Sequence, residues 1–152
     1  MIIRQYQLLD LEEVKNLHIL ALKNAGAFYE SGSWDADLDH IEERYIHRGG
    51  EFLVGFLDGK LIAMGALKKN DNKTCEVKRM RVHPDYQRRG YGQIMLAKLE
   101  KRAEELGYKN IQLDTTIKQR PAQAMYLKNG YAEIRRETEG WPLETIFYQK
   151  EL

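Results

Sequence analysis

Residues 77–92 read VKRMRVHPDYQRRGYG and decide how the rest of the chain is interpreted. An apolar, strand-like run ends at a proline turn, and a basic loop with two glycines then leads directly into an amphipathic helix. Backbone N–H groups, the positive end of the helix dipole and the guanidinium groups of the loop would all point at one place. Such an arrangement is typical of a diphosphate site, so we expect a cofactor that carries a diphosphate.

Two glycines and two arginines define this loop. Gly90 and Gly92 lack a Cβ atom, so a phosphate can approach the backbone amides closely. Arg88 and Arg89 add donors for charge-assisted hydrogen bonds. Taken alone, the pattern also fits a tight turn beside a solvated basic surface. The strand before the loop and the helix after it favour the anion site.

The composition is that of an ordinary soluble protein. With 152 residues, of which 43% are hydrophobic and 31% charged, the chain is expected to form a single domain over residues 1–152. The net charge is only +1, so the field of the whole molecule argues neither for nor against binding of nucleic acid. The basic residues are instead concentrated between residues 78 and 93, which favours a compact anionic ligand over nucleic acid.

The expected location follows from three features of the sequence. Cys75 is the single cysteine, so an intrachain disulfide is excluded, as is usual in a reducing compartment. The apolar runs are shorter than the ~20 residues that a membrane-spanning helix needs. The N-terminus lacks the basic and apolar regions of a secretory signal. We therefore expect a cytoplasmic protein without a membrane partner.

Hydrophobic periodicity predicts an alternation of strands and helices. Strands are expected at residues 2–8, 52–57, 61–67, 74–82, 111–115, 131–136 and 145–150. Helices are expected at residues 10–24, 36–47, from the glycine loop to residue 106, and at 121–129. Asp10 is predicted to cap the first helix with Glu13 as its partner, and Asp58-Gly59 predicts a hairpin. The order predicts an α/β protein in which one mixed sheet has helices on both faces.

Three motifs occur in register between residues 76 and 131. Residues 87–92, QRRGYG, follow the pattern Gln/Arg-x-x-Gly-x-Gly/Ala. Residues 76–84 form a strand and a proline turn directly before it. The third motif is a helix and turn with Ala122, Tyr126, Gly130 and Tyr131. Together they resemble the phosphate loop, fourth strand and tyrosine-bearing helix of the GCN5-related N-acetyltransferases, the GNAT family.

The resemblance implies both a fold and an activity. The fold is the acyl-CoA N-acyltransferase fold, with one mixed, mostly antiparallel sheet of about seven strands flanked by about four helices. The activity is transfer of the acetyl group of acetyl-CoA to a primary amine, by direct attack in a ternary complex without a metal or a covalent intermediate. The alternative is a non-catalytic module of the same fold that senses acetyl-CoA or CoA. Because dimers are frequent in the family, the resemblance also allows a homodimer.

The resemblance assigns the cofactor-binding residues by position. The diphosphate would bind amides around the glycine loop, and the pantetheine arm would pair like an extra strand with the backbone of Met80 and Val82. The full set is Met80, Arg81, Val82, Gln87, Arg88, Arg89, Gly90, Tyr91, Gly92, Gln93, Gln119 and Tyr126. Gln119 departs from the family pattern, because asparagine is usual there and usually hydrogen-bonds the pantetheine arm.

Tyr126 is the residue to which the resemblance gives the role of general acid. In the family, the tyrosine at this position protonates the departing thiolate. A phenol with a reference pKa of ~10 suits this role, because a thiolate of similar basicity can accept its proton. The alternative is a core aromatic residue on an amphipathic helix.

Glu76 is the candidate base, because an incoming ammonium must lose a proton before its nitrogen can attack. Several family members carry a glutamate at this distance before the residue equivalent to Val82, while others use different residues or a water chain. A regular strand would place Glu76, Lys78, Met80 and Val82 on one face. The alternative is a strand carboxylate that faces solvent or pairs with Lys78.

The acceptor side would be built by the segment between the first two helices. This segment holds Phe28, Tyr29 and Trp34 together with several carboxylates. Aromatic rings beside carboxylates can receive a cationic amine through cation–π and charge attraction. The alternative is a loop that packs its rings on the core. The sequence predicts a small-molecule or peptide amine as the acceptor, without distinguishing between them.

Overall fold

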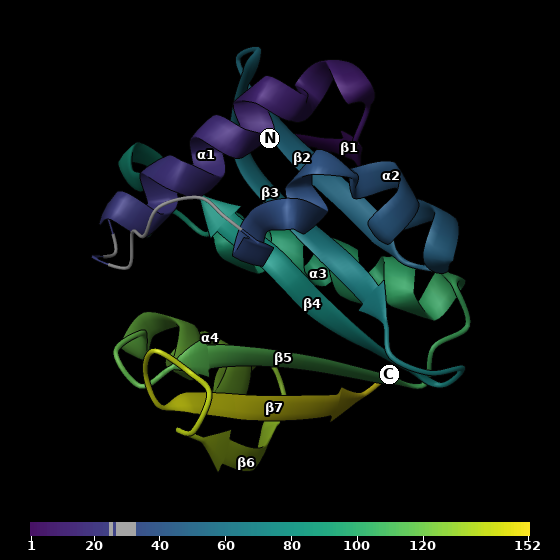
Figure 1. Cartoon of the computed structure of the whole chain (residues 1–152), viewed down its shortest axis with the longest axis vertical. Coiled ribbons are helices and arrows are strands. Elements are labelled where there is room, and N and C mark those ends of the chain that lie inside the picture. The colour runs from purple at the N-terminus through teal and green to yellow at the C-terminus, as the bar shows by residue number, and fades with distance from the viewer. Residues whose placement is uncertain (25, 27–32) are drawn as a thin grey trace.

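The computed structural model describes residues 1–24, 26 and 33–152, with the backbone alone for residues 33–35. Its centre is a seven-stranded sheet in the order β1-β2-β3-β4-β5-β7-β6 (Figure 1). The strands are β1 (Ile2–Gln5), β2 (Glu51–Leu57), β3 (Lys60–Lys69), β4 (Thr74–Val82), β5 (Asn110–Thr116), β6 (Ala132–Glu137) and β7 (Thr145–Glu151). Neighbouring strands are antiparallel except for β4 and β5, which are parallel.

Helices cover both faces of this sheet, as the sequence predicts. The helices α1 (Leu11–Asn24) and α2 (Ile41–Arg44) lie over β2, β3 and β4 on one face, and α3 (Tyr91–Glu105) lies on the other (Figure 1). The helix α4 (Arg120–Lys128) packs on the same face as α3, beside β5 and β7. Within the described part of the chain, no helix is both long enough and apolar enough to cross a membrane.

The core consists of two hydrophobic clusters, one on each face of the sheet. Val14 of α1 packs with Phe52 and Met64 in the first cluster. Leu99 of α3 packs with Ile62 and other strand residues in the second. Both faces are apolar because successive side chains of β2 and β3 point to opposite sides and both sides are covered by helices. The predicted fold class, a mixed and mostly antiparallel sheet with four α-helices, is confirmed.

Two turns have the conformation that their residues predict. Asp58 and Gly59 connect β2 and β3 with φ of 50° and 80°, the left-handed pair that a two-residue hairpin requires. Gly107 follows α3 with φ of 91°, as a glycine after a helix C-terminus does. The predicted hairpin and the predicted end of this helix are therefore confirmed.

The start of α1 differs from its prediction. Asp10 ends the short 3-10 helix η1 (Leu8–Asp10), and its carboxylate is buried. The carboxylate accepts hydrogen bonds from the Arg4 guanidinium at 2.7 and 2.8 Å and from the Gln7 N–H at 2.8 Å. The predicted capping role of Asp10 and Glu13 is wrong, because the cation on β1 and the backbone before η1 occupy the Asp10 oxygens.

The predicted helix 36–47 is divided into three short pieces. They are the 3-10 helix η2 (Ser33–Asp39), α2, and the 3-10 helix η3 (Ile46–Arg48). The backbone leaves the helical region at His40, with φ of −141° and ψ of 48°. Leu38, Ile41 and Tyr45 are nevertheless all buried, as their spacing predicts. The apolar pattern therefore identified the buried side of this segment but not its interruption.

Candidate functional site

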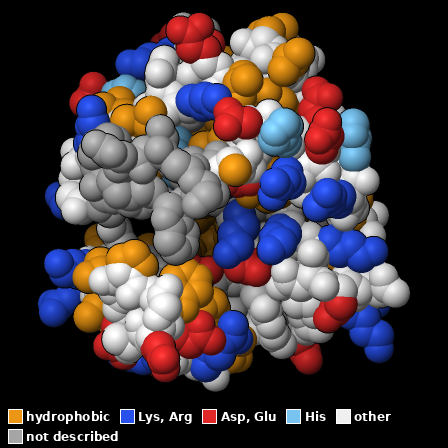
Figure 2. All heavy atoms as spheres, in the orientation of Figure 1, with side chains coloured by type: hydrophobic (Ala, Val, Ile, Leu, Met, Phe, Trp, Pro, Cys, Tyr) orange, Lys and Arg blue, Asp and Glu red, His pale blue; other side chains and the backbone are white. Residues whose placement is uncertain are grey.

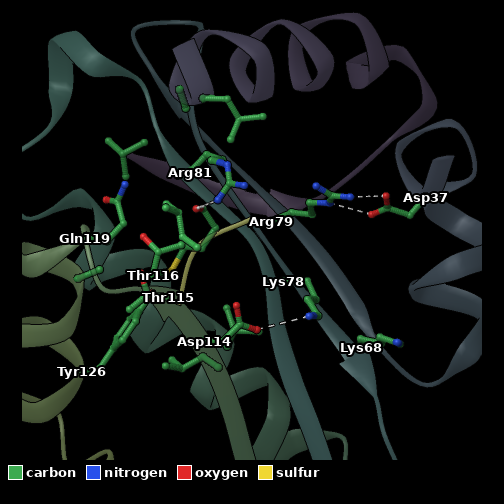
Figure 3. Close-up of a pocket in the computed structure, with 18 of the residues that line it drawn as sticks. Asp37, Lys68, Lys78, Arg79, Arg81, Asp114, Thr115, Thr116, Gln119 and Tyr126 are labelled. Carbon is green, nitrogen blue, oxygen red and sulfur yellow. Dashed lines mark hydrogen bonds and ion pairs between the residues drawn. The ribbon is translucent and has the colours of Figure 1, made fainter. Parts of the chain in front are cut away.

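A cavity opens where the two parallel strands of the sheet separate. β4 pairs with β5 from Thr74 to Glu76, and beyond this point the strands diverge (Figure 1). The cavity between them has a volume of about 1080 Å³ and also reaches α2 and α4. Its lining from β4, β5 and α4 includes Met80, Arg81, Val82, Asp114, Thr115, Thr116 and Tyr126 (Figure 3). The backbone edges that face each other here lack a strand between them, so an extended ligand can pair with them.

A β-bulge in β4 changes which side chains share a face. Arg79 has φ of 55°, and the register between β3 and β4 shifts at this point. Met80 and Val82 consequently pack against the same cluster as Cys75 and Val77, on the α3 side. The regular alternation expected from the sequence, with Met80 and Val82 on the face of Glu76, is wrong because the bulge adds one residue.

The glycine loop presents free backbone donors at the end of β4. Gly90 has φ of 87° and precedes α3 as its N-cap, without a side chain that could cap it. The first helical hydrogen bond runs from the Ile94 N–H to the Gly90 oxygen at 3.1 Å, so the three N–H groups before Ile94 have no partner in the helix. A Cβ atom on Gly90 would meet nothing within 4 Å, so this space is open. These features fit a diphosphate.

The other predicted cofactor residues divide into two groups. Met80, Arg81, Val82, Gln87, Gln119 and Tyr126 line the cavity. The Gln87 amide donates to the Val82 oxygen at 3.1 Å, which fixes the loop on the end of β4. Arg88, Arg89, Gly90, Tyr91, Gly92 and Gln93 form the loop and the first turn of α3.

Within the loop the side chains have separate contacts. The Arg89 guanidinium lies 5.6 Å from the centre of the Tyr86 ring, and the Tyr91 ring is 6.4 Å from the same ring. The Gln93 amide exchanges two hydrogen bonds with the Asn129 amide, at 2.7 and 2.6 Å. Gln93 therefore joins α3 to α4 through its side chain, and only its backbone N–H is directed to the anion site.

Tyr126 of α4 lies in the cavity wall with 6% of its surface exposed. Its ring packs on the rings of Tyr131 and Tyr148, with centres 6.0 and 5.7 Å away. Burial raises the pKa of Tyr126, and the Asp114 carboxylate raises this pKa further. The phenol therefore keeps its proton at neutral pH, as a general acid must.

Lys78 connects two carboxylates at the narrow end of the cavity. Its Nζ lies 2.6 Å from Oε2 of Glu76 and 3.5 Å from Oδ2 of Asp114. Lys78 and Asp114 line the cavity, and Figure 3 shows Asp114 between Lys78 and Tyr126. Glu76 is not a lining residue, and its second oxygen accepts a hydrogen bond from Asn70 at 3.2 Å. The role of Glu76 as a base stays a prediction.

Asp114 is the titratable residue of the site that the sequence analysis missed. Burial raises its pKa, and the opposing effect of Lys78 does not cancel this. A raised pKa makes the ionised carboxylate a stronger base. The available signal was a carboxylate in a central strand, directly after the alternating buried positions Ile111 and Leu113. Its position opposite Lys78 follows only from the pairing of β4 with β5.

A second ion pair joins the bulge to the segment before α2. The Arg79 guanidinium donates from Nε and Nη2 to the two Asp37 oxygens at 3.0 and 2.6 Å (Figure 3). The Tyr45 hydroxyl donates to Asp37 at 2.5 Å. Burial raises the pKa of Asp37, but the hydrogen bonds from Arg79 and Tyr45 outweigh this, so the pKa is lowered. Asp37 is therefore ionised and already paired.

The predicted acceptor residues fall at the edge of what the structure describes. Phe28 and Tyr29 lie outside the described residues, and Trp34 is described by its backbone alone. Their role in acceptor binding stays a prediction. The described wall on this side of the cavity includes Ala36, Asp37, Arg44, Tyr45, Arg48 and Lys68.

Comparisons with known proteins agree with this geometry. The family model described as "Acetyltransferase (GNAT) family" matches residues 13–131. The chain is similar to the structure of a GNAT acetyltransferase from Staphylococcus aureus Mu50, with 25% identity, a TM-score of 0.88 and coverage of 99% of this chain and 98% of that one. A search of curated proteins found no match.

Two further solved structures have the same fold. An acetyltransferase from Streptococcus agalactiae 2603 is 21% identical with a TM-score of 0.89, covering 99% of this chain and 98% of that one. An acetyltransferase from Salmonella typhimurium, solved with acetyl-CoA, is 18% identical with a TM-score of 0.81, covering 99% and 92%. The family model spans most of the chain and includes the glycine loop and Tyr126. The chain therefore belongs to the GNAT family of acetyltransferases.

Proposed function

We propose that this protein is an N-acetyltransferase that transfers the acetyl group of acetyl-CoA directly to a primary amine. The observation that carries the proposal is a combination of two features, the N–H groups without a helical partner in the glycine loop after β4 and a protonated Tyr126 beside Asp114 in the cavity wall. Binding alone requires only the first of these features. The paired acid and base favour an enzyme over a sensor of CoA.

The roles follow from the chemistry of each group. Acetyl-CoA, when bound, supplies the acetyl group and the leaving thiolate. The N–H groups at the start of α3 bind its diphosphate, and the open backbone edge of β4 near Met80 and Val82 orients its pantetheine arm. The ammonium loses one proton to a carboxylate, and the resulting amine forms the C–N bond as the C–S bond breaks. The Tyr126 hydroxyl donates its proton to the departing sulfur, and the phenolate is reprotonated by the second proton that the nitrogen sheds as the amide forms.

For the base we propose Asp114 in preference to Glu76. Asp114 lines the cavity, and the positive charge of Lys78 opposes the effect of burial on its pKa by favouring the ionised carboxylate. Glu76 is not a lining residue, and its carboxylate instead interacts with the Lys78 ammonium and accepts a hydrogen bond from the Asn70 amide. Glu76 then acts on the reaction through Lys78, as a positioning residue.

Direct transfer is supported by the state of the single cysteine. Cys75 is fully buried in the α3-side cluster. Burial raises the pKa of Cys75 to about 12, so its thiolate is scarce at neutral pH. An acetyl group carried on this sulfur is therefore disfavoured, and attack by the amine on the thioester requires no protein nucleophile.

Thiol release tests the proposal. The protein is incubated with acetyl-CoA and a panel of neutral, cationic and anionic amines, and free CoA thiol and acetylated product are measured together. We expect equal amounts of the two for at least one class of amine. Tight binding of acetyl-CoA without product from any amine would instead support the sensor.

Gly90→Val tests the position of the diphosphate. A Cβ atom at Gly90 would meet no other atom within 4 Å, so a side chain here enters the open space beside the first N–H groups of α3. The φ of Gly90 is 87°, which a β-branched residue rarely adopts, so the melting temperature should fall. We expect the Kd for acetyl-CoA to rise about 10-fold or more, the effect of losing one charge-assisted hydrogen bond.

Gly107→Val is the control for Gly90→Val, because Gly107 has φ of 91° and a Cβ atom there would also meet nothing within 4 Å. It should lower the melting temperature but leave the Kd for acetyl-CoA unchanged in calorimetry. A Gly90→Val protein that folds and binds acetyl-CoA like the wild type would show that the diphosphate binds elsewhere.

A further inference from the structure

Three cationic side chains line the cavity on its α2 side. Arg44 belongs to α2, Arg48 to η3 and Lys68 to β3, and all three are exposed. We call them the acceptor-side cations. Glu51 pairs with Leu67, so the turn that carries Arg48 lies beside Lys68. Figure 2 shows lysine and arginine side chains gathered in this part of the molecule.

The described carboxylates that line the cavity, Asp37 and Asp114, and the neighbouring Glu76 already have other partners. Asp37 accepts from Arg79 and Tyr45. Asp114 and Glu76 both lie beside Lys78. Among the residues that the structure describes, none of the acceptor-side cations forms an ion pair with a carboxylate. Counted over the described side chains, this end of the cavity therefore has a surplus of positive charge.

The cofactor diphosphate does not account for this surplus. Lys68 is paired with Glu76, six residues before Val82 at the other end of β4. An extended strand of this length spans about 20 Å. The glycine loop follows Val82, so Lys68 and the N–H groups of this loop lie toward opposite ends of β4, and Asp114 and Tyr126 line the cavity beside this strand.

We propose that the acceptor is a small amine that also carries a carboxylate or a phosphate, which the acceptor-side cations bind. The proposal rests on the acetyl transfer proposed above. The anionic group contacts Arg44, Arg48 and Lys68, and the amine then lies toward Asp114. Guanidinium groups suit both anions, because their planar N–H groups match carboxylate and phosphate oxygens in pairs. A diamine would be repelled from this end of the cavity.

Matched amine pairs test the proposal at equilibrium. The protein is saturated with CoA, and calorimetry gives the Kd for 2-aminoethyl phosphate against ethanolamine and for β-alanine against β-alaninamide. We expect the anionic member of at least one pair to bind about 10-fold or more tightly, as for a charge-assisted hydrogen bond. The preferred pair identifies phosphate or carboxylate. The preference should shrink as salt rises, because the three cations are exposed.

Two triple variants that remove the same amount of charge test whether the acceptor-side cations cause the preference for the anionic amine. The triple substitution Arg44→Gln, Arg48→Gln and Lys68→Gln should abolish it. The control triple, Lys98→Gln, Lys101→Gln and Lys109→Gln, removes the same formal charge from exposed positions outside the cavity lining and should retain it. Melting curves of both variants verify that each is folded.

Equal affinity within both pairs would overturn the proposal, as would tighter binding of 1,4-diaminobutane than of either anionic amine. A preference that survives in the first triple variant would overturn it too. Because these readouts are equilibrium affinities, they are separate from turnover. Anion preference without thiol release from any amine would refute the acetyl transfer while supporting the anionic ligand. Thiol release without a preference for the anionic amine would support the acetyl transfer and refute the anionic acceptor.

Discussion

Replacing Tyr126 with phenylalanine is expected to lower kcat by about 100-fold or more, the usual contribution of a positioned general acid. Burial and the Asp114 carboxylate both raise the pKa of this phenol, so it is protonated throughout the neutral range. Phenylalanine keeps the ring contacts with Tyr131 and Tyr148 and removes only the proton donor. The Kd for acetyl-CoA should therefore stay close to its wild-type value in calorimetry.

Tyr148→Phe is the matched control for this substitution. Tyr148 belongs to the same cluster, is also buried, and has its ring 5.7 Å from that of Tyr126, but it does not line the cavity. Its kcat should equal the wild-type value. If Tyr126→Phe also turned over at the wild-type rate, with both proteins folded, then Tyr126 would have only a packing role.

Replacing Asp114 with asparagine is expected to lower kcat/KM by about 100-fold, because the amide does not accept the proton of the ammonium. The pH dependence provides the sharper test. Burial raises the pKa of Asp114, and only the ionised form is a base. Wild-type kcat/KM should rise with pH through this raised pKa. Ionisation of the amine substrate affects the wild type and Asp114→Asn equally, so its effect cancels in the ratio of their kcat/KM values. This ratio should rise with pH through the same range.

Glu76→Gln separates the two candidate bases. Both Glu76 and Asp114 raise the pKa of Lys78 against the lowering effect of its burial, so each substitution removes one carboxylate from the same lysine. We expect Glu76→Gln to change kcat/KM much less than Asp114→Asn. Because the Glu76 carboxylate helps to raise the pKa of Asp114, the rise of kcat/KM with pH should remain in this variant but move to lower pH. The opposite ranking, with a large loss in Glu76→Gln and little in Asp114→Asn, would return the role of base to Glu76.

Many elements of this fold could be predicted because their signals are local. Alternating apolar residues marked the strands, and Asp58-Gly59 marked a hairpin that has the expected left-handed conformations. The glycine loop was recognisable because Gly90 occupies a conformation that other residues rarely adopt. Arg88 also has a left-handed backbone conformation, with φ of 63°. This could not be predicted, because arginine does not favour that conformation.

The site was less predictable because its residues meet across the sheet. Asp37 and Arg79 are 42 positions apart, and neither residue type specifies the other. The bulge at Arg79 has no sequence signal, yet it turns Met80 and Val82 to the α3 side. The sequence does not distinguish Asp114 from the other carboxylates, because its position beside Lys78 depends on the pairing of β4 with β5.

The sequence by itself determined the order of the elements, the turns and the glycine loop, because each depends on the backbone preferences of neighbouring residues. The tertiary structure alone decided which titratable groups share the cavity and how burial shifts their pKa. Those properties depend on where β4 and β5 separate and on the added residue at Arg79. The separation of the two strands and the charges that surround the cavity depend on many residues that are distant in the sequence. A local sequence pattern therefore cannot predict them.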